Sequence, residues 1–218
     1  MRLKRSPARL VRAVPRVVRS SLALALVAWV LVRAGWSAPL PMLSDDQQRR
    51  LDAGEVIVLD ALPPGAGKST HGGTALAVVR ASPERVWRIL VDYPGHTRYY
   101  PRVTGVEVLE ADEQHALVRY EVGIGPFSFR FHMSTHLDPI QRRIEWQLAD
   151  GHANRLLREN TGYWQLGEAP GGTLVTYALA VRTILPAFAT SGSERESLVD
   201  TIKALRKLAE EGDGTPLR

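Results

Sequence analysis

The chain has 218 residues, 44% of them apolar, which is enough for one domain with a sizeable hydrophobic core. It contains no cysteine, so disulfide bonds, thiolate metal sites, cysteine nucleophiles and a lipid-modified N-terminal cysteine are excluded. The formal charge of +5 favours a nucleic acid or an acidic membrane surface as partner only if the basic residues belong to the folded part of the chain.

The basic residues are concentrated at the N-terminus. Residues 1–37 hold 8 of the 28 Lys and Arg and none of the 23 acids, so the remainder has 20 basic against 23 acidic residues, a net charge of −3. We therefore expect no nucleic-acid partner. An apolar run over residues 22–32 follows the basic start, as in a signal peptide, and at Arg33 it stops short of the about 20 residues that span a bilayer.

This pattern predicts cleavage after Ser37 and export to the periplasm or cell envelope of a bacterium. The alternative is an N-terminal membrane anchor, which would keep the protein associated with the membrane. The sequence does not indicate an oligomeric state.

Residues 38–73 are predicted to form an N-terminal extension. Ser44 and Gln47 have the spacing of a capping box, and Gly54 is typical of a helix end, which together predict a short helix over residues 45–53. A β-branched run over 56–59 predicts a strand, and a loop rich in proline and glycine follows it.

The main domain is predicted to begin at Thr74 with a strand that ends near Arg80. Ser82 then provides an N-cap and Pro83 the first helical residue, before apolar residues at helical spacing. This helix is expected to end near residues 93–95, and residues 96–100 to form one more helical turn.

From residue 103 onward, apolar and polar residues alternate, which predicts five or six antiparallel strands with no helix between them. The clearest strand is 127–137, where Phe127, Phe129 and Phe131 share the apolar face. An amphipathic helix begins at Ser193, and its apolar face is expected to lie across the sheet. Residues 213–218 are expected to form a tail.

This order of elements resembles the START-like helix-grip superfamily, also called SRPBCC. Residues 81–93, Ala-Ser-Pro-Glu-Arg-Val-Trp-Arg-Ile-Leu-Val-Asp-Tyr, resemble the opening signature of its polyketide cyclase/dehydrase and coenzyme Q-binding branch. Residues 99–103 and the Gly-Gly-Thr turn at 171–173 continue the match. Over 74–212 the resemblance implies an α+β fold, with a curved antiparallel sheet wrapped around a long C-terminal helix and short helices after the first core strand.

The resemblance also implies an apolar cavity between sheet and helix, suited to a lipid, a quinone or a polyketide. Ordinary core packing is the alternative for each inward residue. The residues expected to bind the ligand are Tyr120, Phe129, Phe131, Trp146, Trp164 and Tyr177 on the sheet and Leu198, Ile202 and Leu205 on the helix.

We predict no catalytic residue, no metal ligand and no cofactor. His132 and His136 share the polar face of one strand, but at about 3.3 Å per residue they lie roughly 13 Å apart, too far for one ion. His96 follows the first helix of the main domain. It is expected to be a surface residue, with an acid/base group at a cavity mouth as the alternative.

The sequence thus favours non-catalytic binding or transport of a hydrophobic small molecule. A polyketide cyclase or aromatase-like enzyme is the first alternative, and it would need a titratable residue pointing inward, where the predicted faces are apolar or aromatic. A protein-interaction module that uses the same fold is the second.

Overall fold

The computed structural model describes residues 42–152, 154, 156–184 and 193–211. The predicted signal peptide or anchor and the tail lie outside the described residues. The chain divides into two compact units, Met1–Pro39 and Leu40–Arg218, and all described residues belong to the second. Its elements are α1 (Asp45–Asp52), β1 (Ile57–Leu59), β2 (His71–Val79), α2 (Pro83–Val91), η1 (Tyr93–Arg98), β3 (Val103–Ala111), β4 (His115–Ile124), β5 (Phe127–Asp138), β6 (Arg143–Leu148), β7 (Leu157–Ala169), β8 (Gly172–Thr183) and α3 (Ser193–Glu210).

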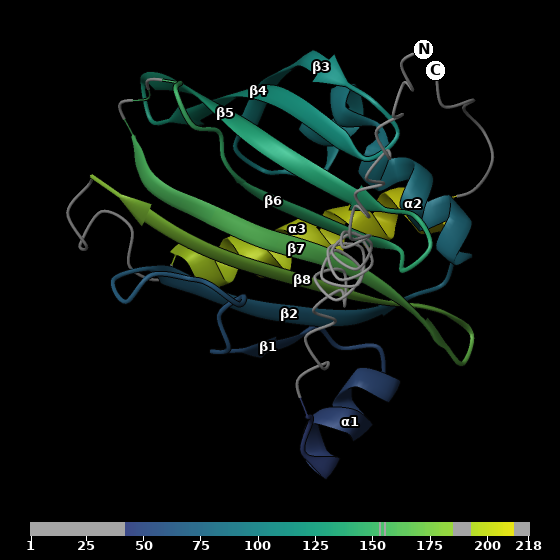
Figure 1. The fold of residues 1–218 in the computed structure, drawn as a ribbon. Helices are drawn as coiled ribbons and strands as arrows, with labels where there is room; N and C mark the ends of the chain where they lie inside the picture. The colour runs from purple at the N-terminus through teal and green to yellow at the C-terminus, as the bar shows by residue number, and fades with distance from the viewer. Residues whose placement is uncertain (1–41, 153, 155, 185–192, 212–218) are drawn as a thin grey trace, which may run out of the picture. The chain divides into compact units, whose positions relative to one another are not determined.

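The strands form one antiparallel sheet in the order β1-β2-β8-β7-β6-β5-β4-β3 (Figure 1). After β2 the chain crosses through α2 and η1 to β3 at the opposite edge, and the meander then returns strand by strand until β8 pairs with β2. The helix α3 runs along one face of this sheet, behind β7 and β8 in Figure 1. The α+β fold with a curved sheet and a long C-terminal helix is therefore as predicted.

The predicted helix starts are confirmed in atomic detail. The Ser44 hydroxyl accepts a hydrogen bond from the backbone N–H of Gln47 (3.2 Å), and the Gln47 side chain accepts one from the backbone N–H of Ser44 (2.9 Å), so α1 has a complete capping box. At α2 the Ser82 hydroxyl accepts from the Arg85 N–H (3.3 Å), and Pro83 occupies the first turn, where its missing N–H costs nothing.

The first long strand, β2, begins at His71, three residues earlier than predicted. The sequence Gly72-Gly73 is typical of a loop, but here it lies within the sheet. A Cβ on Gly72 would lie 1.9 Å from the carbonyl oxygen of Leu179 on β8, so only glycine allows this backbone approach.

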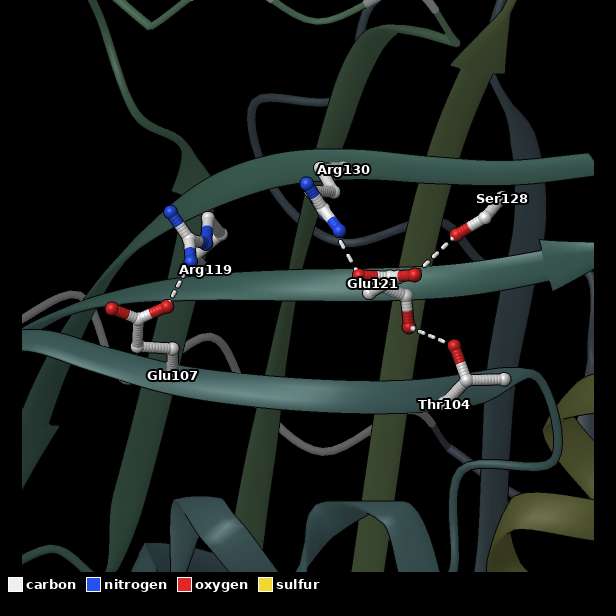
Figure 2. Close-up of polar contacts among 6 residues, drawn as sticks. All are labelled: Thr104, Glu107, Arg119, Glu121, Ser128 and Arg130. Carbon is white, nitrogen blue, oxygen red and sulfur yellow. Dashed lines mark hydrogen bonds and ion pairs between the residues drawn. The ribbon is translucent and has the colours of Figure 1, made fainter.

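One face of the sheet, which we call the inner face, carries the main apolar core. The other, which we call the polar face, is polar except where α1 packs on β1 and β2 through a small apolar cluster that includes Leu51, Ile57 and Leu76. Figure 2 shows the polar face at β3, β4 and β5, where Arg119 pairs with Glu107 and Arg130 pairs with Glu121 (2.8 Å). These side chains are largely exposed, so each pair contributes little to stability. Phe127, predicted to face the core, is 65% exposed; it is the first residue of β5 and pairs with Ile124 at the hairpin end of the two strands.

The loop between β1 and β2 is held on the polar face. The hydroxyl of Thr74 donates to the carbonyl of Ala61 (2.6 Å), and the carboxylate of Glu159 on β7 accepts from the backbone N–H of Gly67 (2.7 Å). The inner face is left to α2, η1 and α3.

Candidate functional site

A cavity of about 190 Å³ lies between the inner face of the sheet and the segment formed by η1 and its connection to β3, with Ser197 of α3 at its edge. Arg102 is the only charged side chain in its described lining. The lining consists of Leu90, Tyr93, His96, Tyr100, Pro101, Arg102, Val103, Tyr120, Val122, Phe131, Met133, Thr135, Ile144, Trp146, Asn160, Trp164, Tyr177, Leu179 and Ser197.

Burial distinguishes two ends of this cavity. At one end, which we call the inner end, Leu90, Tyr93, His96 and Thr135 are all buried. At the other, the mouth, Pro101 and Arg102 are exposed, and Asn160 and Ser197 are half-buried. Among the described residues, the cavity therefore opens between the η1–β3 connection and the first turns of α3.

Aromatic side chains from three neighbouring strands form one wall of the cavity. The rings of Trp164 and Tyr177 stack with their centroids 4.1 Å apart and their planes 15° apart, and the Trp146 ring lies 5.9 Å from that of Tyr177. The indole N–H groups are satisfied, since Trp164 donates to the Tyr100 hydroxyl (3.0 Å) and Trp146 donates to the Asn160 amide oxygen (3.2 Å). The wall is thus apolar and fixed in orientation.

The position of the Trp146 ring depends on Gly162, its register partner on β7. A Cβ on Gly162 would lie 2.3 Å from the indole Cζ2 atom and 2.3 Å from the carbonyl oxygen of Ala178. The absence of a side chain at residue 162 therefore creates the space in which the indole lies against β7.

The inner end is organised around His96, which is only 4% exposed. Its Nε2 lies 2.9 Å from the carbonyl oxygen of Leu90, and its Nδ1 lies 2.8 Å from the hydroxyl of Tyr120. Since a carbonyl oxygen only accepts, Nε2 carries the proton, and in the neutral imidazole Nδ1 accepts from Tyr120. Burial lowers the pKa of His96 to about 4, although the bond to Leu90 opposes that shift, so the ring is neutral at physiological pH.

Tyrosine rings surround His96. The ring centroids of Tyr93, Tyr99, Tyr100 and Tyr120 lie 5.1, 5.2, 5.4 and 5.9 Å from its own. Burial raises the pKa of Tyr93 to about 12 and raises those of the other three phenols as well. The inner end is consequently polar but uncharged.

Two of these phenols have buried hydroxyls without a well-formed hydrogen bond among the described residues. The hydroxyls of Tyr93 and Tyr99 make no hydrogen bond of good geometry with a described residue. That of Tyr93 lies near the Thr135 hydroxyl, and that of Tyr99 lies near the Tyr100 hydroxyl. Tyr93 lines the cavity, whereas Tyr99 belongs to the packed core beside it.

Five of the nine residues predicted to bind ligand line the cavity, and four do not. Phe129 is half-buried and packs against the core cluster that includes Tyr120 and Phe131, but it does not itself line the cavity. The three predicted residues of α3 are 0–1% exposed and pack in the core, because the small residues on β2 let α3 approach the sheet closely. The nearest Leu198 methyl would lie 3.4 Å from a Cβ built on Gly73. The five that line it are Tyr120, Phe131, Trp146, Trp164 and Tyr177; the three helix residues outside it are Leu198, Ile202 and Leu205.

The sequence interpretation missed the contribution of η1. His96 is buried at the inner end, so the prediction of a surface histidine is wrong, and Tyr93 and Tyr100 join it in the lining. The run from Asp92 to Arg102 contains four aromatic residues, counting the imidazole, and only short apolar stretches. That aromatic density was the one available signal that this connection packs against the sheet.

Among the residues that the structure describes, no group of three or more His, Asp or Glu side chains has a geometry that could hold a metal ion. Within the same part of the chain, no helix has the length and apolar character needed to cross a bilayer.

The fold and the cavity define a START-like protein of the helix-grip class. The chain belongs to the family described as polyketide cyclase / dehydrase and lipid transport, whose model matches residues 79–206. No curated protein matches the chain at a significant level.

Solved structures with the same fold include a STAR-related lipid transfer protein from Xanthomonas axonopodis, at 18% identity and a TM-score of 0.55, covering 71% of this chain and 92% of that one. A START superfamily protein from Mycobacterium smegmatis is 20% identical with a TM-score of 0.53, covering 63% and 96%. The di-domain ARO/CYC BexL is 18% identical with a TM-score of 0.50, covering 66% and 51%. At these identities the likeness shows the fold alone.

Proposed function

We propose that this protein binds and carries a hydrophobic small molecule, such as a lipid, a quinone or a polyketide-like compound, without catalysing a reaction. The observation that carries the proposal is the cavity with its fixed aromatic wall and its uncharged inner end. Its volume of about 190 Å³ is below the about 300–1,000 Å³ of sites for drug-sized ligands, so it encloses one end of an amphiphile or a single small ring.

A cyclase-like enzyme is the strongest alternative, because His96 is a titratable residue in the cavity lining. Both of its nitrogens are already hydrogen-bonded, and a pKa of about 4 makes it a weak base at neutral pH. Its partner Tyr120 has a raised pKa and is a correspondingly weak acid. These properties suit a fixed binding surface better than proton transfer.

We further propose that the protein acts in the cell envelope after removal of residues 1–37, in view of the basic and apolar N-terminal sequence. The mass of the protein purified from its own cells tests this. A chain that starts at Ala38 supports export with cleavage, and an intact N-terminus contradicts the cleavage.

Binding can be tested by filling the cavity. Val122 is half-buried and lines it, so Val122→Trp places an indole in the ligand's space at a cost of about 1–3 kcal/mol in overpacking. Val108, on the inner side of the edge strand β3, is 38% exposed and outside the lining, which makes Val108→Trp a matched control.

The measurement is a titration of the purified protein with 1-decanol, followed by tryptophan fluorescence. We expect saturable binding in the wild type and in Val108→Trp, and a loss of at least about tenfold in affinity in Val122→Trp. Equal affinity in all three proteins would place the binding elsewhere and contradict the proposal.

A further inference from the structure

The buried hydroxyl of Tyr93 is an unusual feature of the inner end. Tyr93 is 8% exposed, and its hydroxyl makes no hydrogen bond with a described residue. A buried polar group without a partner costs stability, so its presence in a cavity lining calls for a partner that arrives with the ligand.

The second feature is the fixed role of Tyr120. Its hydroxyl proton is committed to Nδ1 of His96, which in turn is held by the bond from Nε2 to the Leu90 carbonyl. The Tyr120 oxygen can therefore only accept a hydrogen bond from a ligand, whereas the Tyr93 hydroxyl, which has the Thr135 hydroxyl near it but no well-formed bond, can donate one to a ligand.

The third feature is the absence of a cation at this end. Arg102 is the only charged group in the described lining, and it lies at the exposed mouth. A carboxylate or phosphate moved to the inner end would lose its hydration without gaining a counter-ion.

From these contacts we propose that the ligand carries an uncharged hydroxyl group at its buried end, which accepts a hydrogen bond from Tyr93 and donates one to Tyr120. The ligand is thus a neutral alcohol with an apolar body, bound with its polar end first. This inference rests on the proposed function and specifies the chemical class of the ligand.

The variant Tyr93→Phe separates this proposal from a structural role. Because it removes a buried hydroxyl that makes no well-formed hydrogen bond with a described residue, it should raise the urea midpoint of the ligand-free protein. The same change should weaken 1-decanol binding by roughly threefold to tenfold, the range that a neutral hydrogen bond provides.

Tyr99→Phe is the matched control, since the Tyr99 hydroxyl is likewise buried without a well-formed hydrogen bond to a described residue, but Tyr99 does not line the cavity. It should raise the urea midpoint and leave 1-decanol binding unchanged. Methyl decyl ether, which accepts but does not donate, should bind more weakly than 1-decanol in the wild type.

Sodium decanoate tests the alternative orientation, with a charged head at the mouth. Decanoate binding that is stronger than that of 1-decanol and is lost in Arg102→Gln would overturn the proposal, as would unchanged 1-decanol affinity in Tyr93→Phe. Either result would leave the proposed function intact. If 1-decanol, its ether and decanoate all fail to bind the wild type, the proposed function itself fails.

Discussion

The buried neutral histidine makes the stability of the protein depend on pH in a predictable direction. Burial lowers the pKa of His96 from 6.5 to about 4 in the folded protein, so between these values the unfolded chain binds a proton that the folded protein does not. Stability due to this group is therefore complete above about pH 6.5 and is lost as the pH falls towards 4.

The size of the effect follows from the shift. One pKa unit corresponds to about 1.4 kcal/mol, so His96 costs about 2 kcal/mol of unfolding free energy between about pH 7.5 and pH 5, and about 3 kcal/mol at pH 4. This is a large part of the about 5–15 kcal/mol that is typical of a whole domain.

Urea unfolding of the wild type and of His96→Gln at about pH 7.5 and pH 5 measures this contribution. Glutamine can hydrogen-bond but does not titrate in this range, so the variant should lose about 2 kcal/mol less than the wild type on acidification. His71→Gln, a change at an exposed residue of β2, should behave like the wild type. An identical pH dependence in the wild type and His96→Gln would refute the reasoning.

Two further predictions concern backbone contacts. Gly162→Ala should destabilise the protein by about 1–3 kcal/mol in urea unfolding and shift the fluorescence of Trp146, because the new methyl group would overlap that indole. Gly167→Ala should be tolerated, because a Cβ there would meet nothing closer than 3.9 Å. Equal destabilisation by the two substitutions would contradict this reasoning. Glu159→Ala should remove the acceptor of the Gly67 amide and reduce its protection from hydrogen exchange, and unchanged protection would show that the loop is held by other contacts.

The aromatic wall could be predicted because it follows from strand periodicity. Trp146, Trp164 and Tyr177 occupy inward positions of their strands, and alternation alone assigns a side chain to one face of a sheet. The capping sequences at Ser44 and Ser82 predicted their helices for a similar reason, since a cap is made by residues three positions apart.

The inner end could not be predicted in this way. His96 is buried through hydrogen bonds to Leu90 and to Tyr120, which is 24 residues away along the chain, so its environment depends on how η1 packs on the sheet. The position of Leu198 depends likewise on the small residues of β2, which bring α3 against the sheet and leave the cavity to the neighbouring strands.

The central claim is that the cavity holds a hydrophobic small molecule. Native mass spectrometry of the protein purified from its own cells tests it most directly, because the spectrum shows any retained molecule together with the mass of the chain. The account predicts one small, uncharged amphiphile per chain, which is absent from Val122→Trp purified in the same way. A wild-type protein that is empty and that also fails to take up added 1-decanol would contradict it.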